Sequence, residues 1–172
     1  VANGGTGAST AAAARSALGA AASSHSHAAA DLRGAAATAT PSAALTMATS
    51  TKALSMKNAA ATGSGLTVGS AGITCGFDGY VMACAGVFFV FPSGEASAGV
   101  ENPEAHIFLG GTDKGGQSVV APGKWGCGVT IAPMLLAVTS GQVVSLRVKN
   151  NTAARGQVQA SLVNYLTVWR VS

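Results

Sequence analysis

A chain of 172 residues is long enough for one or two domains. Ten Lys and Arg against six Asp and Glu leave a net charge of +4, and no two basic residues are adjacent. The chain therefore has no basic cluster to follow a phosphate backbone, which argues against a nucleic-acid partner. No apolar run approaches the roughly 20 residues of a membrane-spanning helix, so we expect no membrane insertion.

The composition changes sharply near residue 70. The residues before it are mostly Ala, Ser, Thr and Gly, whereas all the aromatic residues follow Gly72. We predict two parts: a fibrous shaft over residues 1–70 and a globular head over residues 71–172. A disordered linker would have a similar composition to the first part, but soluble linkers usually depend on charge, and this segment carries little.

A short helix is predicted near the start of the chain, from Thr10 to Leu18. Ser9 or Thr10 can cap its first turn, and Gly19 suits the left-handed position just past its end. A helix of this length is marginal in water by itself. We therefore expect several copies of it to pack around a symmetry axis.

The segment 4–32 has a distinctive order of motifs: Gly-Gly-Thr-Gly, an Ala run that ends in Arg15, Leu-Gly, and then His-Ser-His before Asp31. This pattern strongly resembles the shaft repeats of bacteriophage tail fibres. The resemblance implies a homotrimer in which the H-x-H pair, here His25 and His27, holds a metal ion on the threefold axis. The fibre family implies iron as that metal.

The spacing of the two histidines is compatible with such a site. On an extended backbone, residues two apart point the same way, so three chains would supply 3 × 2 = 6 imidazole nitrogens. Six nitrogen ligands suit an octahedral first-row ion better than zinc, which prefers four. The alternative is that His25 and His27 are exposed polar residues of a loop.

A second periodicity begins after Pro41. Ala44 to Met47 is followed nine residues later by the similar Ala53 to Met56, and Leu66 to Val68 partly repeats it. Each unit places two apolar side chains on one face of an extended strand. We interpret these units as rungs of a β shaft, with a chance recurrence in an Ala-rich and Thr-rich segment as the alternative.

The second part of the chain alternates short apolar runs with turn residues. We predict a mainly β fold, a jelly-roll β-sandwich. The expected strands are 71–76, 79–91, 105–110, 117–121, 126–133, 135–139, 142–149 and 157–171.

Some of these strands have one apolar face and others have two. From Gln142 to Lys149, one face is apolar and the other is largely polar, which is typical of a sheet with one side in water. From Tyr80 to Phe91, and again from Leu162 to Val171, both faces are apolar. A single sandwich core covers only one face of a strand, so we expect neighbouring subunits to cover the second.

Three motifs of this second part resemble the trimeric jelly-roll heads of the C1q and tumour-necrosis-factor type. They are Asp78-Gly79-Tyr80-Val81, the strand Val138 to Val148, and the terminal Ser161 to Leu166. The chain departs from the family pattern at Gln142, where Asp is usual, and at Asn164, where Gly is usual. Such heads cap the tips of phage fibres, so the resemblance implies a trimeric tip.

The three cysteines, Cys75, Cys84 and Cys127, show no C-x-x-C spacing and lie in apolar strands. We expect buried, reduced thiols, as suits a protein assembled in a cytoplasm.

No catalytic constellation is evident, and we do not expect an enzyme. His106 follows Glu101 and Glu104, and we interpret it as a hydrogen-bonded histidine beside an acidic loop. A polysaccharide-degrading tailspike would need two carboxylates held roughly 5–9.5 Å apart. Nothing in the sequence pairs the acidic residues of the head, and Asp78 is assigned to a turn.

We therefore expect the C-terminal fragment of a phage tail fibre, part of the virion, assembled in the host cytoplasm, whose tip binds a host-surface receptor. A purely structural cap and a degrading spike are the alternatives. Loops of the sandwich are the expected binding regions, at 92–104, 112–117, 122–126 and 150–156. Within them the candidate receptor-binding residues are Trp125, Lys124, Asp113 and Asn151. Trp125 could stack on a sugar ring, or it could pack in the core or at the subunit interface.

Overall fold

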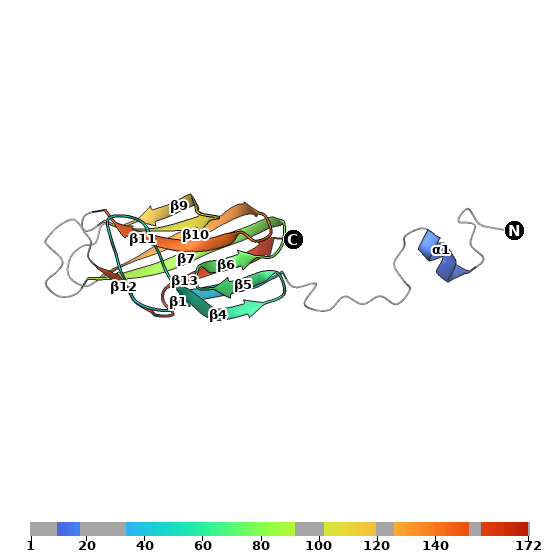
Figure 1. Cartoon of the computed structure of the whole chain (residues 1–172), viewed down its shortest axis with the longest axis horizontal. Coiled ribbons are helices and arrows are strands. Elements are labelled where there is room, and N and C mark those ends of the chain that lie inside the picture. The colour runs from blue at the N-terminus through green and yellow to red at the C-terminus, as the bar shows by residue number, and fades with distance from the viewer. Residues whose placement is uncertain (1–9, 18–33, 92–101, 120–125, 152–155, 172) are drawn as a thin grey trace. The chain divides into compact units, whose positions relative to one another are not determined.

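The computed structural model describes residues 10–17, 34–91, 102–119, 126–151 and 156–171 (Figure 1). The chain divides into two compact units, residues 1–32 and residues 33–172. In the first unit, the described part is the helix α1 (Ala11–Ala17). In the second unit, the described residues form thirteen strands.

Helix α1 begins where the sequence predicts. The Oγ1 of Thr10 accepts a hydrogen bond from the N–H of Ala13 at 3.1 Å, and the carbonyl of Thr10 accepts one from Ala14 at 2.9 Å. Thr10 is therefore the N-cap, and it satisfies a backbone donor that has no partner within the helix. The expected end of the helix at Leu18 lies outside the described residues.

The first sheet, sheet A, is built around the long strand β7, which pairs with β10 along one edge and with β13 and β12 along the other. The strand order is β2-β12-β7-β13-β1-β4, and all the pairings are antiparallel. Its strands are β1 (Ala36–Pro41), β2 (Leu45–Thr46), β4 (Met56–Thr62), β7 (Gly79–Val90), β10 (Cys127–Val138), β12 (Gln157–Val158) and β13 (Tyr165–Val171).

The second sheet, sheet B, is built around β11, which pairs with β8 on one edge and with β6 and then β3 on the other. The strand order is β5-β6-β11-β8-β9. Its strands are β3 (Lys52–Ala53), β5 (Leu66–Gly69), β6 (Gly72–Cys75), β8 (Pro103–Leu109), β9 (Thr112–Ser118) and β11 (Val143–Asn150).

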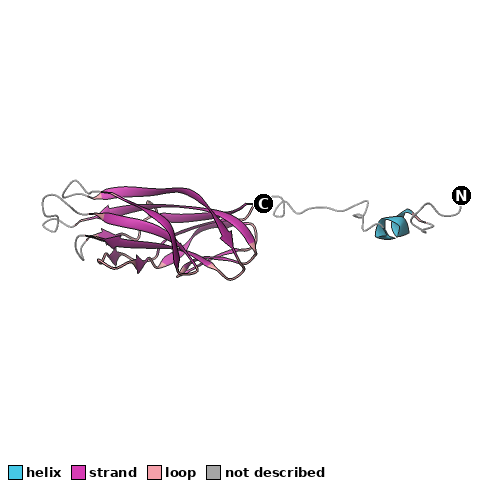
Figure 2. Ribbon diagram, turned by 90° about the horizontal axis from the view of Figure 1, so that it is seen from above, coloured by secondary structure: helices cyan, strands magenta, loops and turns pink. Residues whose placement is uncertain are grey.

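The two sheets face each other as the layers of a sandwich (Figure 2). Alternate residues of β7 point into the core, as do alternate residues of β11, because successive side chains of a strand point to opposite faces. The core residues below are all at most 2% exposed. They include Val81, Ala83, Ala85, Val87, Phe89, Leu166 and Val168 from sheet A, and Ile73, Ile107, Val144, Leu146 and Val148 from sheet B. The mainly β, jelly-roll-like fold predicted from the sequence is confirmed.

The sandwich begins earlier than the sequence predicts. Strands β1 to β5 lie between residues 36 and 69 and pair within the same two sheets, so the predicted boundary at residue 70 is displaced to about residue 33. The nine-residue periodicity marks the sandwich and not shaft rungs, because Met47, Leu54 and Met56 are buried in its core.

Four of the predicted strands differ from those observed. The expected strands 126–133 and 135–139 form the single strand β10, in which a bulge between Ile131 and Met134 accommodates Pro133. The expected strand 157–171 is divided into β12 and β13. The strand expected at 117–121 is β9, which begins at Thr112, so residues 112–117 are not a loop. In the described part of the chain, no helix is long and apolar enough to cross a membrane.

Candidate functional site

The predicted site residues are only partly within the described structure. His25, His27, Lys124 and Trp125 lie outside the described residues, and so do most of the loops expected to bind a receptor. Asp113 lies in β9, and Asn151 follows the end of β11. Both belong to one cluster of polar side chains on the outer face of sheet B.

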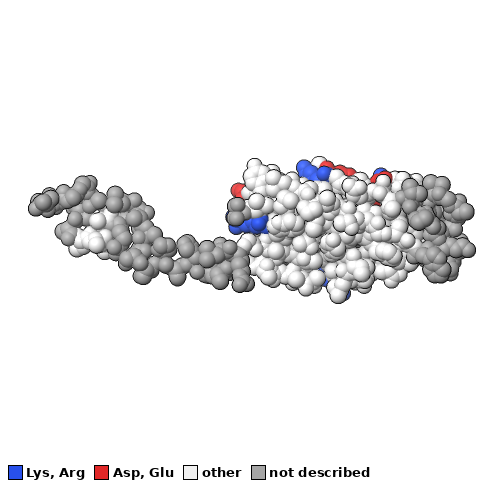
Figure 3. All heavy atoms as spheres, turned by 180° about the vertical axis from the view of Figure 1, so that it is seen from behind, with Lys and Arg blue, Asp and Glu red and all other residues white. Residues whose placement is uncertain are grey.

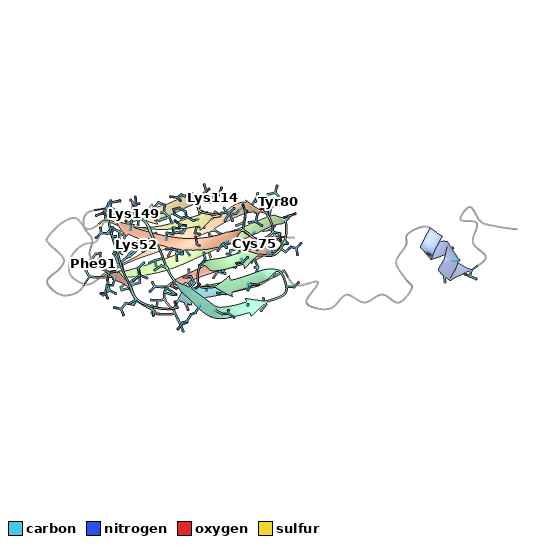
Figure 4. The ribbon with its side chains drawn as sticks, viewed as in Figure 1. Lys52, Cys75, Tyr80, Phe91, Lys114 and Lys149 are labelled. Atoms are coloured by element: carbon cyan, nitrogen blue, oxygen red, sulfur yellow. The ribbon has the colours of Figure 1, made fainter. Side chains whose placement is uncertain are left out.

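Glu104 is the centre of that cluster. Its Oε2 lies 2.9 Å from Nε2 of His106 and 3.0 Å from Nζ of Lys149, while Asn151 donates a hydrogen bond to its Oε1. Strand register explains the arrangement, because Lys149 of β11 stands directly opposite Glu104 of β8. Lys149 lies on the β11 side of the sandwich, close to the strand that carries Lys52 (Figure 4).

Asp113 approaches the same histidine from the other side. Its Oδ2 lies 2.9 Å from Nδ1 of His106, although the contact lacks the alignment of a hydrogen bond. Gly116 makes room for the ring, since a Cβ at Gly116 would stand 2.5 Å from Cγ of His106. The imidazole is thus held between two carboxylates, and it packs against the backbone of Gly116. We name Glu104, His106, Asp113, Lys149 and Asn151 the charged network.

This network corrects one expectation and confirms another. The sequence pairs none of the acidic residues, but the fold brings Glu104 and Asp113 together through His106. The hydrogen-bonded histidine is confirmed, although His106 lies within β8. Asp78 is also confirmed at a turn, where its Oδ1 accepts a hydrogen bond from the N–H of Ser140 at 2.7 Å.

The ionisation of Glu104 follows from these contacts. Burial alone would raise the pKa of this carboxyl group, but the hydrogen bonds from His106, Lys149 and Asn151 outweigh burial and hold the pKa below its ordinary value. Both carboxylate oxygens of Glu104 therefore already accept hydrogen bonds from neighbouring side chains. Among the described residues, no group of three or more His, Cys, Asp or Glu side chains is arranged to hold a metal ion.

A pocket of about 700 Å³ opens next to the network on sheet B. Turn residues of three connections line its rim, and the outward residues Ser145 and Arg147 of β11 line it as well. The guanidinium carbon of Arg147 stands 4.3 Å from the centre of the Phe108 ring, and its Nε is buried without a hydrogen-bond partner. Arg147 is the cross-strand neighbour of His106, so the pocket and the charged network adjoin.

The sequence indicated the polar face of β11 but not this pocket. The alternation from Val143 to Lys149 predicts that Ser145 and Arg147 point away from the core, which the structure confirms. The alternation does not predict which strand pairs with β11 beside these two residues. Phe108 and the pocket residues Ser70, Ala71, Gly110 and Gly111 come from segments more than 30 residues away in the chain.

The outer face of sheet A is apolar. Tyr80, Leu135 and Val171 are 55%, 58% and 41% exposed. The register places Val171 opposite Tyr80, and it places Leu135 and Trp169 on the two sides of Met82. We name these five residues the apolar patch. In the space-filling view from behind, uncharged residues make up most of the described surface and the charged side chains lie near its edges (Figure 3).

Two of the three cysteines, Cys75 and Cys127, are buried, and Cys84 is partly exposed. The described thiols of Cys75, Cys84 and Cys127 are free, and burial raises the pKa of each above its ordinary value. The expectation of free thiols is confirmed for all three, and that of burial for Cys75 and Cys127.

The two facing antiparallel sheets form a jelly-roll-like sandwich. Solved structures of murine APRIL have the same fold: one, at pH 5.0, matches with a TM-score of 0.64 and 9% identity, and covers 81% of this chain and 100% of that chain. A second, at pH 8.0, matches with a TM-score of 0.61, 9% identity and the same coverage. No protein-family model and no curated protein matches the sequence. At this identity the similarity shows the fold alone.

Proposed function

We propose that this chain is the tip of a bacteriophage tail fibre, a homotrimeric head that attaches the virion to the surface of its host. The fold supports the proposal of a trimeric head, because jelly rolls of the tumour-necrosis-factor type form trimers. The resemblance of residues 4–32 to fibre shaft repeats supports the phage origin. The proposed iron site at His25 and His27 belongs to that shaft.

The apolar patch on sheet A is the main structural support for the proposed trimer. Tyr80, Leu135 and Val171 are large apolar side chains that the described chain leaves in contact with water. A contiguous exposed apolar surface of this kind marks an interaction site. A second and a third copy of the same chain would cover it about a threefold axis, as expected from the doubly apolar strands.

The polar outer face of sheet B is then the surface that remains for a receptor. It carries the charged network, with the predicted residues Asp113 and Asn151, and the adjoining pocket. Attachment requires binding groups without turnover, so we propose no enzymatic activity.

Two measurements test this proposal. Light scattering of the full chain should return three times the chain mass of 16.7 kDa, and a stable monomer at micromolar concentration would contradict the trimer. Fluorescently labelled protein should bind cells of susceptible bacterial strains. A trimer that binds no strain and no glycan on an array would be a structural cap, and turnover of host polysaccharide would identify a degrading spike.

A further inference from the structure

Arg147 is the charged residue of the sheet B pocket. The other described lining residues are neutral, and none of the described ion pairs involves Arg147. The ion pairs of the nearby carboxylates go to other residues: Glu104 contacts His106 and Lys149, and Asp113 contacts His106. The pocket therefore presents a guanidinium that forms none of the ion pairs of the described residues.

The guanidinium is also held in place. It stacks on Phe108 at 4.3 Å, which is within the range of a cation–π contact, and Phe108 itself is only 9% exposed. The Nε of Arg147 is buried without a hydrogen-bond partner. A buried donor without a partner is costly, and a ligand or an ordered water that accepts from the guanidinium would remove that cost.

Neutral hydrogen-bonding groups surround the arginine. Ser55, Ser70 and Ser145 line the pocket, and Ser145 is only 7% exposed. Gln142 accepts a hydrogen bond from the N–H of Thr139 at 3.0 Å through its Oε1, so its amide NH₂ is left as the donating end. Hydroxyl and amide groups are suited to the hydroxyl groups of a sugar.

We propose that this pocket binds the carboxylate of an acidic sugar, with the carboxylate on Arg147 and the ring hydroxyls on the serines and Gln142. A planar guanidinium matches a planar carboxylate in a two-bond geometry. A phosphate carries up to two negative charges, and here a single cation lines the pocket. The pocket volume of about 700 Å³ lies within the roughly 300–1,000 Å³ of small-ligand sites.

The pocket stays open in the proposed trimer. Ser145 and Arg147 belong to the outer face of sheet B, whereas the apolar patch belongs to sheet A. Three pockets per head would bind repeats of one acidic polysaccharide together, which raises the overall affinity without new contacts. The biological role of the pocket rests on the proposed attachment function, but its affinity for acidic sugars does not.

The direct experiment compares matched sugars on the full-length protein. Glucuronate and glucose differ by a carboxylate in place of a hydroxymethyl group, and glucose 6-phosphate tests the phosphate. Calorimetry or ligand-observed NMR should show glucuronate binding at least about tenfold more tightly than glucose, as expected for a charge-assisted pair. Equal binding of glucose and glucuronate, tighter binding of glucose 6-phosphate, or no binding of any of the three would overturn the proposal.

Three variants and a control locate the site. Arg147→Lys keeps the positive charge but loses the planar guanidinium that donates two hydrogen bonds to a carboxylate. Arg147→Gln removes the positive charge. Both variants should weaken glucuronate binding by about tenfold or more. Arg170→Gln is the matched control, because Arg170 also stacks on an aromatic ring, Phe77, at 4.3 Å, but does not line the pocket. Ser145→Ala should weaken binding of the sugar and leave the melting temperature nearly unchanged.

The outcomes separate this site from the proposed function. If Arg147→Gln binds glucuronate like the parent protein, the pocket is not the site, even where the protein still attaches to cells. If the protein binds glucuronate through Arg147 but attaches to no bacterial strain, the pocket assignment holds and the attachment function is wrong.

Discussion

The ring of Tyr165 lies over Gly86 of the neighbouring strand, so closely that a Cβ at Gly86 would stand 2.5 Å from its Cε1. The two residues are direct cross-strand partners on the outer face of sheet A. The absence of a side chain at Gly86 allows the aromatic ring to lie flat against the sheet. Tyr165 therefore packs against the same face of sheet A that carries the apolar patch.

Gly86→Ala should therefore displace the Tyr165 ring and lower the free energy of unfolding by about 1–3 kcal/mol, as overpacking does. Gly128→Ala is the control on the adjacent strand β10, because a Cβ there meets its nearest atom at 3.7 Å, an ordinary contact. Denaturant unfolding of the two variants checks the difference. Equal stabilities would mean that the Tyr165 ring moves aside without cost.

The apolar patch predicts how the assembly can be broken. Leu135 is 58% exposed in the chain, so Leu135→Glu should change the stability of the isolated fold by less than about 0.5 kcal/mol. In the trimer the carboxylate would be buried without a partner, and light scattering should show a shift towards the monomer mass. Thr67→Glu, an exposed position on sheet B, should leave the mass at the trimer value. A Leu135→Glu trimer would exclude this face as the interface.

Asn164 is a buried polar residue that closes the loop before β13. It is fully buried, its Oδ1 accepts a hydrogen bond from the N–H of Phe88, and its Nδ2 donates to the carbonyl of Gln159 at 2.8 Å. Asn164→Ala removes the partners of two partly buried backbone groups and should lower the free energy of unfolding by about 1–3 kcal/mol. Asn58→Ala, at an exposed position of β4, should stay within about 0.5 kcal/mol of the parent protein in the same unfolding measurement.

The charged network predicts a pH dependence. The pKa of Glu104 is below its ordinary value of 4.5 in the folded chain, so ionised Glu104 stabilises the fold above that pH, and the contribution is lost as pH falls through the lowered pKa. Glu104→Gln should cost about 1–3 kcal/mol at pH 7, and the difference from the parent protein should close in acid below pH 4.5. Unfolding curves between pH 7 and pH 3 measure this. A difference that stays constant over the whole range would show that the carboxylate charge is not the cause.

The shaft predicts bound iron. Protein purified without a histidine tag should contain about one iron for three chains, because three His25 and three His27 supply one octahedral site. Elemental analysis checks the ratio, and the double variant His25→Ala, His27→Ala should contain none. Zinc at the same ratio, or no metal in the parent protein, would contradict the proposed site.

The local patterns of the head were sufficient for its main strands. The alternation from Val143 to Asn150 determines which face of β11 enters the core, because each side chain follows from its neighbours two residues away. Thr10 marks the start of α1 for a similar reason, since a cap acts on backbone groups three or four residues further along. Gly110 and Gly111, both with positive φ, form the predicted turn between β8 and β9.

Only the tertiary structure decided where the short strands and the polar cluster lie. Strands β2 and β3 are two residues long and exist because β12 and β11, about a hundred residues further on, provide hydrogen-bond partners. His106 meets Asp113 through the pairing of β8 with β9, and Arg147 meets Phe108 through the pairing of β11 with β8. Register between strands depends on the packing of the whole sandwich, and no pattern within one strand encodes it.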